Sequence, residues 1–248
     1  MIWVYALVVA LASVQLSAFA TTIYLHRGLT HRALVLHPAV AFLMRLQLWL
    51  ATGIVPRDWI AIHRKHHRYP DQEGDPHSPR LKGLAKILFG NLYYYAREAR
   101  NRETLERFAP DIGKDWLDRR VFSRGGLGLL VGLVIFMALL GPLAGGLAFA
   151  VQAVVYVFLS AVINGAGHAL GHQPFENTAT NLQSVAWLTA GEGLHNNHHE
   201  FPTSARFSLR PGEFDPAWPV IRLLAAVRLA RPLHVAPPAS TDSQRAPQ

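Results

Sequence analysis

The first 25 residues, MIWVYALVVALASVQLSAFATTIYL, contain no charged side chain. About 20 consecutive apolar residues suffice to cross a bilayer as a helix. A secretory signal peptide is the rival interpretation, but it needs basic residues before its apolar stretch, and here they come after it. The sequence therefore predicts a transmembrane helix over 1–25, with the N-terminus outside and His26 in the cytoplasm, because positive charge favours that side.

A second apolar pair, 125–141 and 143–163, lies further along the chain. Each segment is long and apolar enough to be predicted as a membrane crossing. Gly141 and Pro142 stand at their junction, and this dipeptide is typical of a turn. We therefore predict a helical hairpin that returns the chain to the side from which it left.

The apolar segment 38–55 needs a different interpretation. It contains Arg45 and Gln47, which are costly at the centre of a bilayer. A single crossing here would also put the histidines before and after it on opposite sides of the membrane. We predict that 38–55 is an interfacial or re-entrant helix, and its side chains are candidates for lining a substrate site.

Together these segments predict an all-α integral membrane protein with about three transmembrane helices, one interfacial helix and a cytoplasmic helical cap. One domain is expected over 1–231, with 56–124 and 164–231 in the cap. A Pro/Ser-rich disordered tail is expected over 232–248. The expected location is a bacterial inner membrane, with the cap in the cytoplasm.

The composition of the chain argues against nucleic acid as a partner and excludes cysteine-dependent chemistry. The net charge is +8, yet only 16% of residues are charged and half are hydrophobic. These values favour anionic lipid over nucleic acid as the partner of the basic surface, and no basic-aromatic nucleic-acid motif is present. There is no cysteine, which excludes disulfides, zinc–thiolate sites, iron–sulfur clusters and thiol catalysis. Any metal must therefore be held by nitrogen or oxygen.

Nine of the 13 histidines fall into a pattern. The spacing H-x-x-H-H occurs twice, as HRKHH and HNNHH, while HRGLTH adds two histidines and NGAGH adds one. The nine are His26, His31, His63, His66, His67, His168, His195, His198 and His199. Because residues i, i+3 and i+4 share a helix face, each H-x-x-H-H directs at least two imidazoles the same way. Nine neutral imidazoles suit transition metals and are too many for one ion, so two metal ions are predicted.

The pair His26 and His31 poses a geometric problem. Residues five positions apart diverge on a regular α-helix. We expect the two side chains to converge only if the helix ends between them, which Gly28 allows.

Plainer interpretations of the histidines stay open. A single H-x-x-H-H is commonly a solvated polar face, and His-rich tracts bind metal adventitiously. Glu192 and His195 also form an E-x-x-H pair, but soluble di-iron carboxylate bundles need two such pairs and further glutamates. Glu192 is therefore predicted to orient an imidazole. The histidines outside the pattern, His37, His77, His172 and His234, are assigned to structure or surface.

In this order, HRGLTH, HRKHH…DPHSP, NGAGH and GEGLHNNHHEFP resemble the motifs of the membrane fatty-acyl desaturases of the stearoyl-CoA delta-9 type, over about residues 20–210. The resemblance implies a non-haem di-iron centre held by the nine histidines, with Asn164 reaching one iron through a water molecule. It also implies that Trp59 lies near the substrate. Arg80 and Lys82 stand near family positions that meet the phosphates of CoA.

The chain departs from the animal enzymes of that family. It starts too late for their additional first helix, so three crossings are expected. Ala61 and Ile62 stand where those enzymes have an Arg-Asp pair that helps hold CoA. No fused cytochrome b5 domain is visible, so the resemblance implies an external electron donor, which is a ferredoxin, a rubredoxin or a cytochrome b5-like protein with a reductase.

The resemblance therefore implies an oxidoreductase with dioxygen as co-substrate. It would introduce a cis double bond, at delta-9, into a saturated fatty-acyl chain carried on CoA or a phospholipid, and its only catalytic groups would be the metal ligands. A membrane di-iron hydroxylase, ketolase or decarboxylase acting on a lipid or hydrocarbon would use the same histidines and is the alternative. A metal transporter needs ligands along a pathway near the bilayer midplane, whereas these histidines lie at or beyond the ends of the predicted helices.

Overall fold

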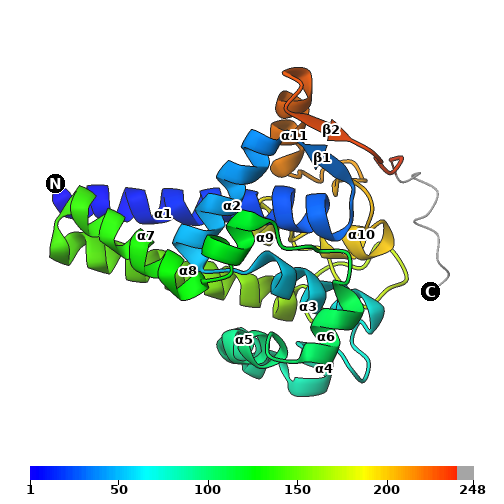
Figure 1. The fold of residues 1–248 in the computed structure, drawn as a ribbon. Helices are drawn as coiled ribbons and strands as arrows, with labels where there is room; N and C mark the ends of the chain where they lie inside the picture. The colour runs from blue at the N-terminus through cyan, green and yellow to red at the C-terminus, as the bar shows by residue number, and fades with distance from the viewer. Residues whose placement is uncertain (239–248) are drawn as a thin grey trace.

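The computed structural model describes residues 1–238, and the chain is mostly helical, as predicted. Three long helices lie alongside one another, and the shorter elements gather at one end of them (Figure 1). The long helices are α1 (Ile2–Ala20), α7 (Gly125–Leu140) and α8 (Pro142–Ala166). The N-terminus lies at the opposite end from the short elements (Figure 1).

Within residues 1–238, two helices are long and apolar enough to cross a membrane by length and composition. One is the 29-residue unit Ile2–Thr30, in which α1 continues into the π-helical segment η1 (Thr21–Thr30), and the other is α8, with 25 residues. α7 is apolar but has 16 residues, which is shorter than the usual span of about 17–25. The crossing predicted over 125–141 therefore stays a prediction.

The segment predicted to be interfacial forms α2 (Pro38–Thr52), which meets α3 (Pro56–Arg68) at 88°, the geometry of a broken span or a re-entrant loop. Gly53 ends α2 with a φ of +65°, a conformation that glycine adopts without steric cost. Arg45 is neutralised by Asp115 and Asp118, at 2.8 and 3.1 Å. Its charge is therefore satisfied within the protein.

The shorter elements surround the end of the long helices. They are α4 (Pro79–Lys82), α5 (Leu84–Glu98), α6 (Arg102–Phe108), η2 (Asp118–Phe122), α9 (Gln183–Leu188), α10 (His195–Glu200) and α11 (Ala217–Ala226). Among them, α5 packs on α8, and α6 packs on α3. The strands β1 (Leu34–Leu36) and β2 (Ala230–Pro232) pair antiparallel, with Val35 opposite Arg231.

The predicted disordered tail begins too early. The amide of Leu233 donates to the carbonyl of Ala33 over 2.8 Å, and the carbonyl of His234 accepts from Ala205 over 2.9 Å. Ala236 is buried, and its amide donates to the hydroxyl of Ser204 over 3.0 Å. The expectation of disorder from residue 232 is therefore wrong for 232–236, because strand pairing and these bonds hold the segment. Residues 239–248 lie outside the described part of the chain.

Small residues let the long helices approach closely. Ala6 and Ala10 of α1 pack on Ala144 and Ala148 of α8. A Cβ atom added to Gly145 would lie 2.3 Å from the carbonyl oxygen of Phe136 in α7, whereas one added to the adjacent Gly146 would meet no atom within 4 Å. Close helix contact through small residues is the usual packing mode in membranes.

These two glycines give a matched test of the α7–α8 packing. Gly145→Ala should lower the thermal midpoint in detergent by about 3–10 °C, because overpacking costs about 1–3 kcal/mol. Gly146→Ala should leave it unchanged or slightly higher, since alanine favours the helix. Equal midpoints for the two variants would contradict the packing.

Candidate metal centre

The chain turns His26 and His31 toward each other by winding as a π-helix. The amide of His31 donates to the carbonyl of His26 over 3.1 Å, and the two ring centroids lie 4.9 Å apart. A π turn closes its hydrogen bond between residues five positions apart, which is the spacing of this pair. A Cβ on Gly28 would lie 3.0 Å from the carbonyl oxygen of Ile23. The helix ends at Thr30, between the two histidines as expected, but the pair converges because the helix widens into a π-helix before it ends.

α3 divides its three histidines between two groups. His63 and His67, one turn apart, point together, with ring centroids 4.6 Å apart. His66 turns away and approaches His199 instead, with 3.3 Å between the Nε2 atoms. The split follows from the helix, because adjacent residues differ by about 100° around its axis.

α10 also divides its three histidines between the two groups. One joins the group of His63 and His67, and two join the group of His66. The Nε2 atom of His198 lies 2.9 Å from that of His67, whereas His195 and His199 face each other across one turn, with 3.2 Å between their Nε2 atoms. His168 follows the end of α8, and its ring lies 4.9 Å from that of His195.

All nine predicted histidines therefore meet, in two groups. The first group is His26, His31, His63, His67 and His198, and the second is His66, His168, His195 and His199. Within each group, one ring nitrogen of every member lies within 4.8 Å of the others. α3 and α10 contribute to both groups, so the two groups are adjacent.

The ring nitrogens fit the requirements of bound metal. The Nε2 atoms of His31, His63 and His168 are buried and have no hydrogen-bond partner among the described residues. Lone pairs of neutral imidazoles that face one another are unfavourable unless a proton or a cation lies between them. An all-nitrogen donor set suits iron, zinc, copper or nickel.

Three buried carboxylates bind the Nδ1 atoms of three of these imidazoles. The pairs are Glu192 with His26 at 2.7 Å, Asp75 with His66 at 3.0 Å, and Asp71 with His168 at 2.8 Å. Such a bond fixes the ring orientation and the tautomer, and it leaves Nε2 free for a metal. The predicted role of Glu192 is therefore confirmed.

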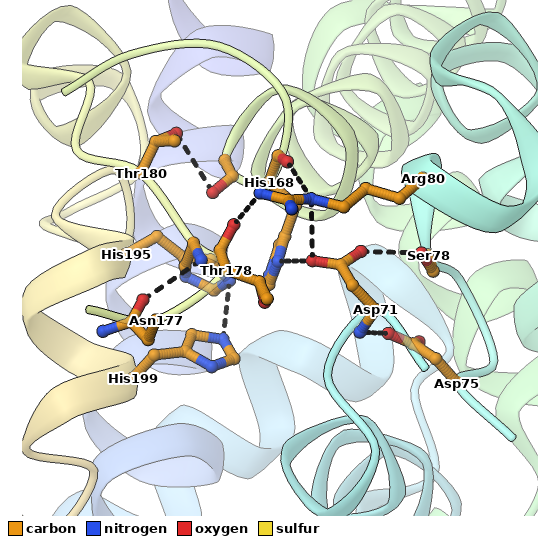
Figure 2. Close-up of polar contacts among 12 residues, drawn as sticks. Asp71, Asp75, Ser78, Arg80, His168, Asn177, Thr178, Thr180, His195 and His199 are labelled. Atoms are coloured by element: carbon orange, nitrogen blue, oxygen red, sulfur yellow. Dashed lines mark hydrogen bonds and ion pairs between the residues drawn. The ribbon is translucent and has the colours of Figure 1, made fainter. Parts of the chain in front are cut away.

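Asp71 and Asp75 were not identified from the sequence. Figure 2 shows Asp71 between His168, Ser78 and Arg80, with Asp75 beside it. The hydroxyl of Ser78 donates to Asp71 over 2.6 Å, and the amide of Asp71 donates to Asp75 over 2.9 Å. Both aspartates lie in PDQEGDPH, two residues beyond HRKHH, but their spacing does not distinguish them from solvated acidic residues.

A largely apolar cavity of about 290 Å³ reaches the first histidine group. Its lining includes apolar side chains from α3, α5, α7 and α8, such as Ile62, Leu92, Leu129 and Val157. His63 lines the metal end of the cavity, and Trp59 stacks on His63 with 4.9 Å between centroids and 8° between planes.

A sequence profile described as "Fatty acid desaturase" matches residues 1–225. The chain belongs to the fatty acid desaturase family. It is thus an oxidoreductase that acts on fatty-acyl chains, and the histidine groups and apolar helices fit a membrane desaturase.

The relatives of this desaturase act, by name, on two acyl carriers. The chain is 32% identical to an acyl-CoA C20 Delta5-desaturase of Anemone leveillei, over 88% of this chain and 70% of the relative. It is 30% identical to Delta-9 acyl-lipid desaturase 2 of Arabidopsis thaliana, over 90% and 72%. It is 32% identical to the sn-1 stearoyl-lipid 9-desaturase of Anabaena variabilis, over 84% and 76%.

The predicted substrate contacts of the desaturase lie in two places. Trp59 and Asn164 line the cavity, and the amide nitrogen of Asn164 donates to Asn91 over 3.0 Å. Arg80 donates to the carbonyls of Thr178 and His168, at 3.0 and 3.5 Å (Figure 2), and does not line the cavity.

Lys82, the other predicted head-group contact, is also engaged with the protein. Its ammonium donates to the carbonyl of Asp75 over 2.9 Å. Both Arg80 and Lys82 are thus bound to the scaffold of the second histidine group, and contact with CoA stays a prediction.

The histidines assigned to structure or surface have separate roles. The ring of His37 accepts from the amide of Ala39 over 3.3 Å and so caps α2. His172 and His234 are exposed. His77 lies closer to the metal centre than expected: it is buried, stacks on His66 at 4.6 Å, and lines the cavity.

A second pocket, of about 420 Å³, reaches the centre from another direction. His31, His67 and His199 line it together with Arg64, and it shares no lining residue with the apolar cavity. All three histidines are partly exposed. The desaturase thus has an apolar approach and a polar approach to its histidine groups.

Burial sets the protonation of the centre. It lowers the pKa of His195, His198 and His199 well below the ordinary value, and the neighbouring imidazoles lower the pKa further. Burial raises the pKa of Asp75 and Glu192, but bonds to His66 and His26 outweigh it and leave both carboxyl pKa values lowered. Neutral imidazoles beside ionised carboxylates are the state that binds metal.

Removal of an orienting carboxylate should weaken metal binding. Asp71→Asn and Asp75→Asn should each lower metal affinity about 10–100-fold, because the imidazoles of His168 and His66 lose the bonds that aim them. Asp115→Asn is the matched control, because the Asp115 carboxylate bonds Arg45 and the amide of Asp118 and no histidine. Chelator competition with metal analysis checks this, and unchanged affinity in both test variants would contradict the assignment.

Acidification should destabilise the folded protein. Histidines of the unfolded chain take up protons near pH 6.5, whereas His195, His198 and His199 of the folded chain stay neutral to a much lower pH. The unfolded state then binds more protons, so stability falls as the pH drops below about 6.5. The thermal midpoint and the metal content should both fall between about pH 7 and 5. A flat profile over that range would contradict this linkage.

Proposed function

We propose that this protein is a dioxygen-dependent fatty-acyl desaturase that introduces a cis double bond, at delta-9, into a saturated chain. Its nine histidines would hold two non-haem iron ions, five on one and four on the other. The observation that carries the proposal is the apolar cavity whose metal end is lined by His63. A chain of methylenes bound there would pass beside the first histidine group.

The iron pair, with dioxygen and two electrons, would supply an oxidant strong enough to remove hydrogen from an unactivated methylene. The protein would bind and orient the chain. Trp59 stacks on His63 and forms a rigid wall where the chain meets the centre. The apolar lining would exclude water from that position.

Asn164 is proposed to hold a water molecule on the ion of the second group. Asn91 fixes its amide nitrogen at 3.0 Å, which leaves the amide oxygen as the atom that would accept from water. The second group has one histidine fewer than the first, so it is the ion that would have room for a further ligand.

Electrons would come from an external donor, which is a ferredoxin, a rubredoxin or a cytochrome b5-like protein. The polar pocket supports this role, because His31, His67 and His199 line it and it is separate from the apolar cavity. The donor and the substrate would then approach without competing. The Arg- and Lys-rich segment 56–124 supports a cytoplasmic location for this face, in a bacterial inner membrane.

Expression in a host that lacks desaturases tests this function. Gas chromatography with mass spectrometry should show new monounsaturated fatty acids that require dioxygen, with derivatised fragments placing the bond. His195→Ala should abolish them, whereas His234→Ala, an exposed histidine outside both groups, should retain them. Hydroxylated or shortened products would instead support the hydroxylase or decarboxylase alternative, and an unchanged profile with iron-loaded protein would refute acyl oxidation.

A further inference from the structure

The apolar cavity opens beside α5. Leu92 lines the cavity, yet 59% of its surface is exposed, so it stands at the boundary between the cavity and the outside. Phe89 and Tyr93 flank it on the same helix and are 85% and 64% exposed. These three residues, Phe89, Leu92 and Tyr93, form the α5 stripe. An exposed apolar stripe beside a cavity opening indicates an apolar environment outside it.

α5 packs on α8, a helix long and apolar enough to span a membrane, near the end of α8 where the shorter elements gather (Figure 1). A Cβ on Gly165 of α8 would lie 3.1 Å from Leu84 and 3.4 Å from Ile87, so the two helices are in close contact there. The hydrogen bond between Asn91 and Asn164 holds the next turn of α5 against α8. The α5 stripe is therefore held beside the last turns of α8, where its apolar segment ends.

The polar residues of α5 fit the same location. Lys86 and Arg97 are exposed and lie seven residues before and four residues after Tyr93, on the face of the stripe. Cations and tyrosine beside an apolar stripe are typical of a helix in the membrane interface. Each cation can meet the single phosphate of a lipid head group.

The cavity lacks the features that a CoA ester would need. CoA carries several phosphates, and such an anion needs a cluster of Arg and Lys side chains at the cavity entrance. Within residues 1–238, no Lys or Arg lines the cavity. Arg80 and Lys82 donate to backbone carbonyls of the metal centre. Ala61 and Ile62 are buried, Ala61 against Ile60 and Ala109.

We propose that the acyl chain enters the cavity sideways from the bilayer, past Leu92, while it is still esterified to a membrane glycerolipid. This inference rests on the proposed desaturase function and names the carrier of its substrate. Sequence similarity does not choose the carrier, because relatives at nearly equal identity are named for CoA and for lipid substrates. The α5 stripe and the absence of a cation cluster on the cavity lining of residues 1–238 favour the glycerolipid over CoA as the carrier.

The carrier is tested in membranes of the expressing host, which supply its electron donors. The membranes are incubated with either deuterated stearoyl-phosphatidylglycerol or deuterated stearoyl-CoA. The intact products are then identified by liquid chromatography with mass spectrometry. The expected product is deuterated monoenoyl-phosphatidylglycerol, formed from stearoyl-CoA only after transfer into lipid. Deuterated monoenoyl-CoA formed without conversion of the phospholipid would overturn the lipid carrier. Neither product, with iron-loaded protein present, would overturn the desaturase function and this inference with it.

The entry route is tested by a matched pair of substitutions. Leu92→Trp should reduce monoene yield at least about tenfold, because a bulky side chain at the opening displaces the chain. Leu139→Trp, on an equally apolar surface of α7 that is 69% exposed and away from the cavity, is the control. It should change the yield less than about twofold.

Iron content separates blocked entry from misfolding. Leu92→Trp should bind as much iron as the parent, which would show that the metal centre still folds. Full activity of iron-loaded Leu92→Trp would overturn the entry route.

Discussion

The structure depends on gathering nine imidazoles inside a protein so that their ring nitrogens face one another. Burial lowers the pKa of those at the end of the chain, including His195 and His198. Three carboxylates bind Nδ1 atoms on the far side of the rings, so that Nε2 atoms face inward. Such a cluster of lone pairs is unfavourable without a cation, which links the stability of this region to metal binding.

This constraint explains local features that otherwise look irregular. The π-helical winding of η1 costs hydrogen-bond geometry relative to an α-helix, yet it is the winding that aligns His26 with His31. Arg80 and Lys82 are exposed or half-exposed cations that donate to backbone carbonyls around His168 and Asp75. Their bonds hold the loop that carries the orienting carboxylates.

Much of the fold and of the site was predictable from sequence. Uncharged apolar runs identified α1 and α8, because a bilayer demands length and apolarity that are visible in composition alone. The repeated H-x-x-H-H spacing identified six of the nine histidines that meet, and HRGLTH and NGAGH supplied the other three. Their division into five and four was not predictable, because it depends on which side of α3 and α10 faces each group.

Other features needed three-dimensional contacts. Asp71 and Asp75 carry no spacing signal that separates them from solvated acidic residues, and only their bonds to His168 and His66 reveal a role. The composition of the tail after Arg231 predicted disorder. The pairing of β2 with β1, which lies almost 200 residues earlier in the chain, is not visible in the composition of the tail.

The most direct test of this account is an anomalous-scattering map, collected at the iron edge, of the protein purified with its native metal. The account predicts two peaks per chain, one among His26, His31, His63, His67 and His198 and one among His66, His168, His195 and His199. A single peak shared by both groups, or a peak coordinated by Asp75 and His77 in place of the second group, would contradict it.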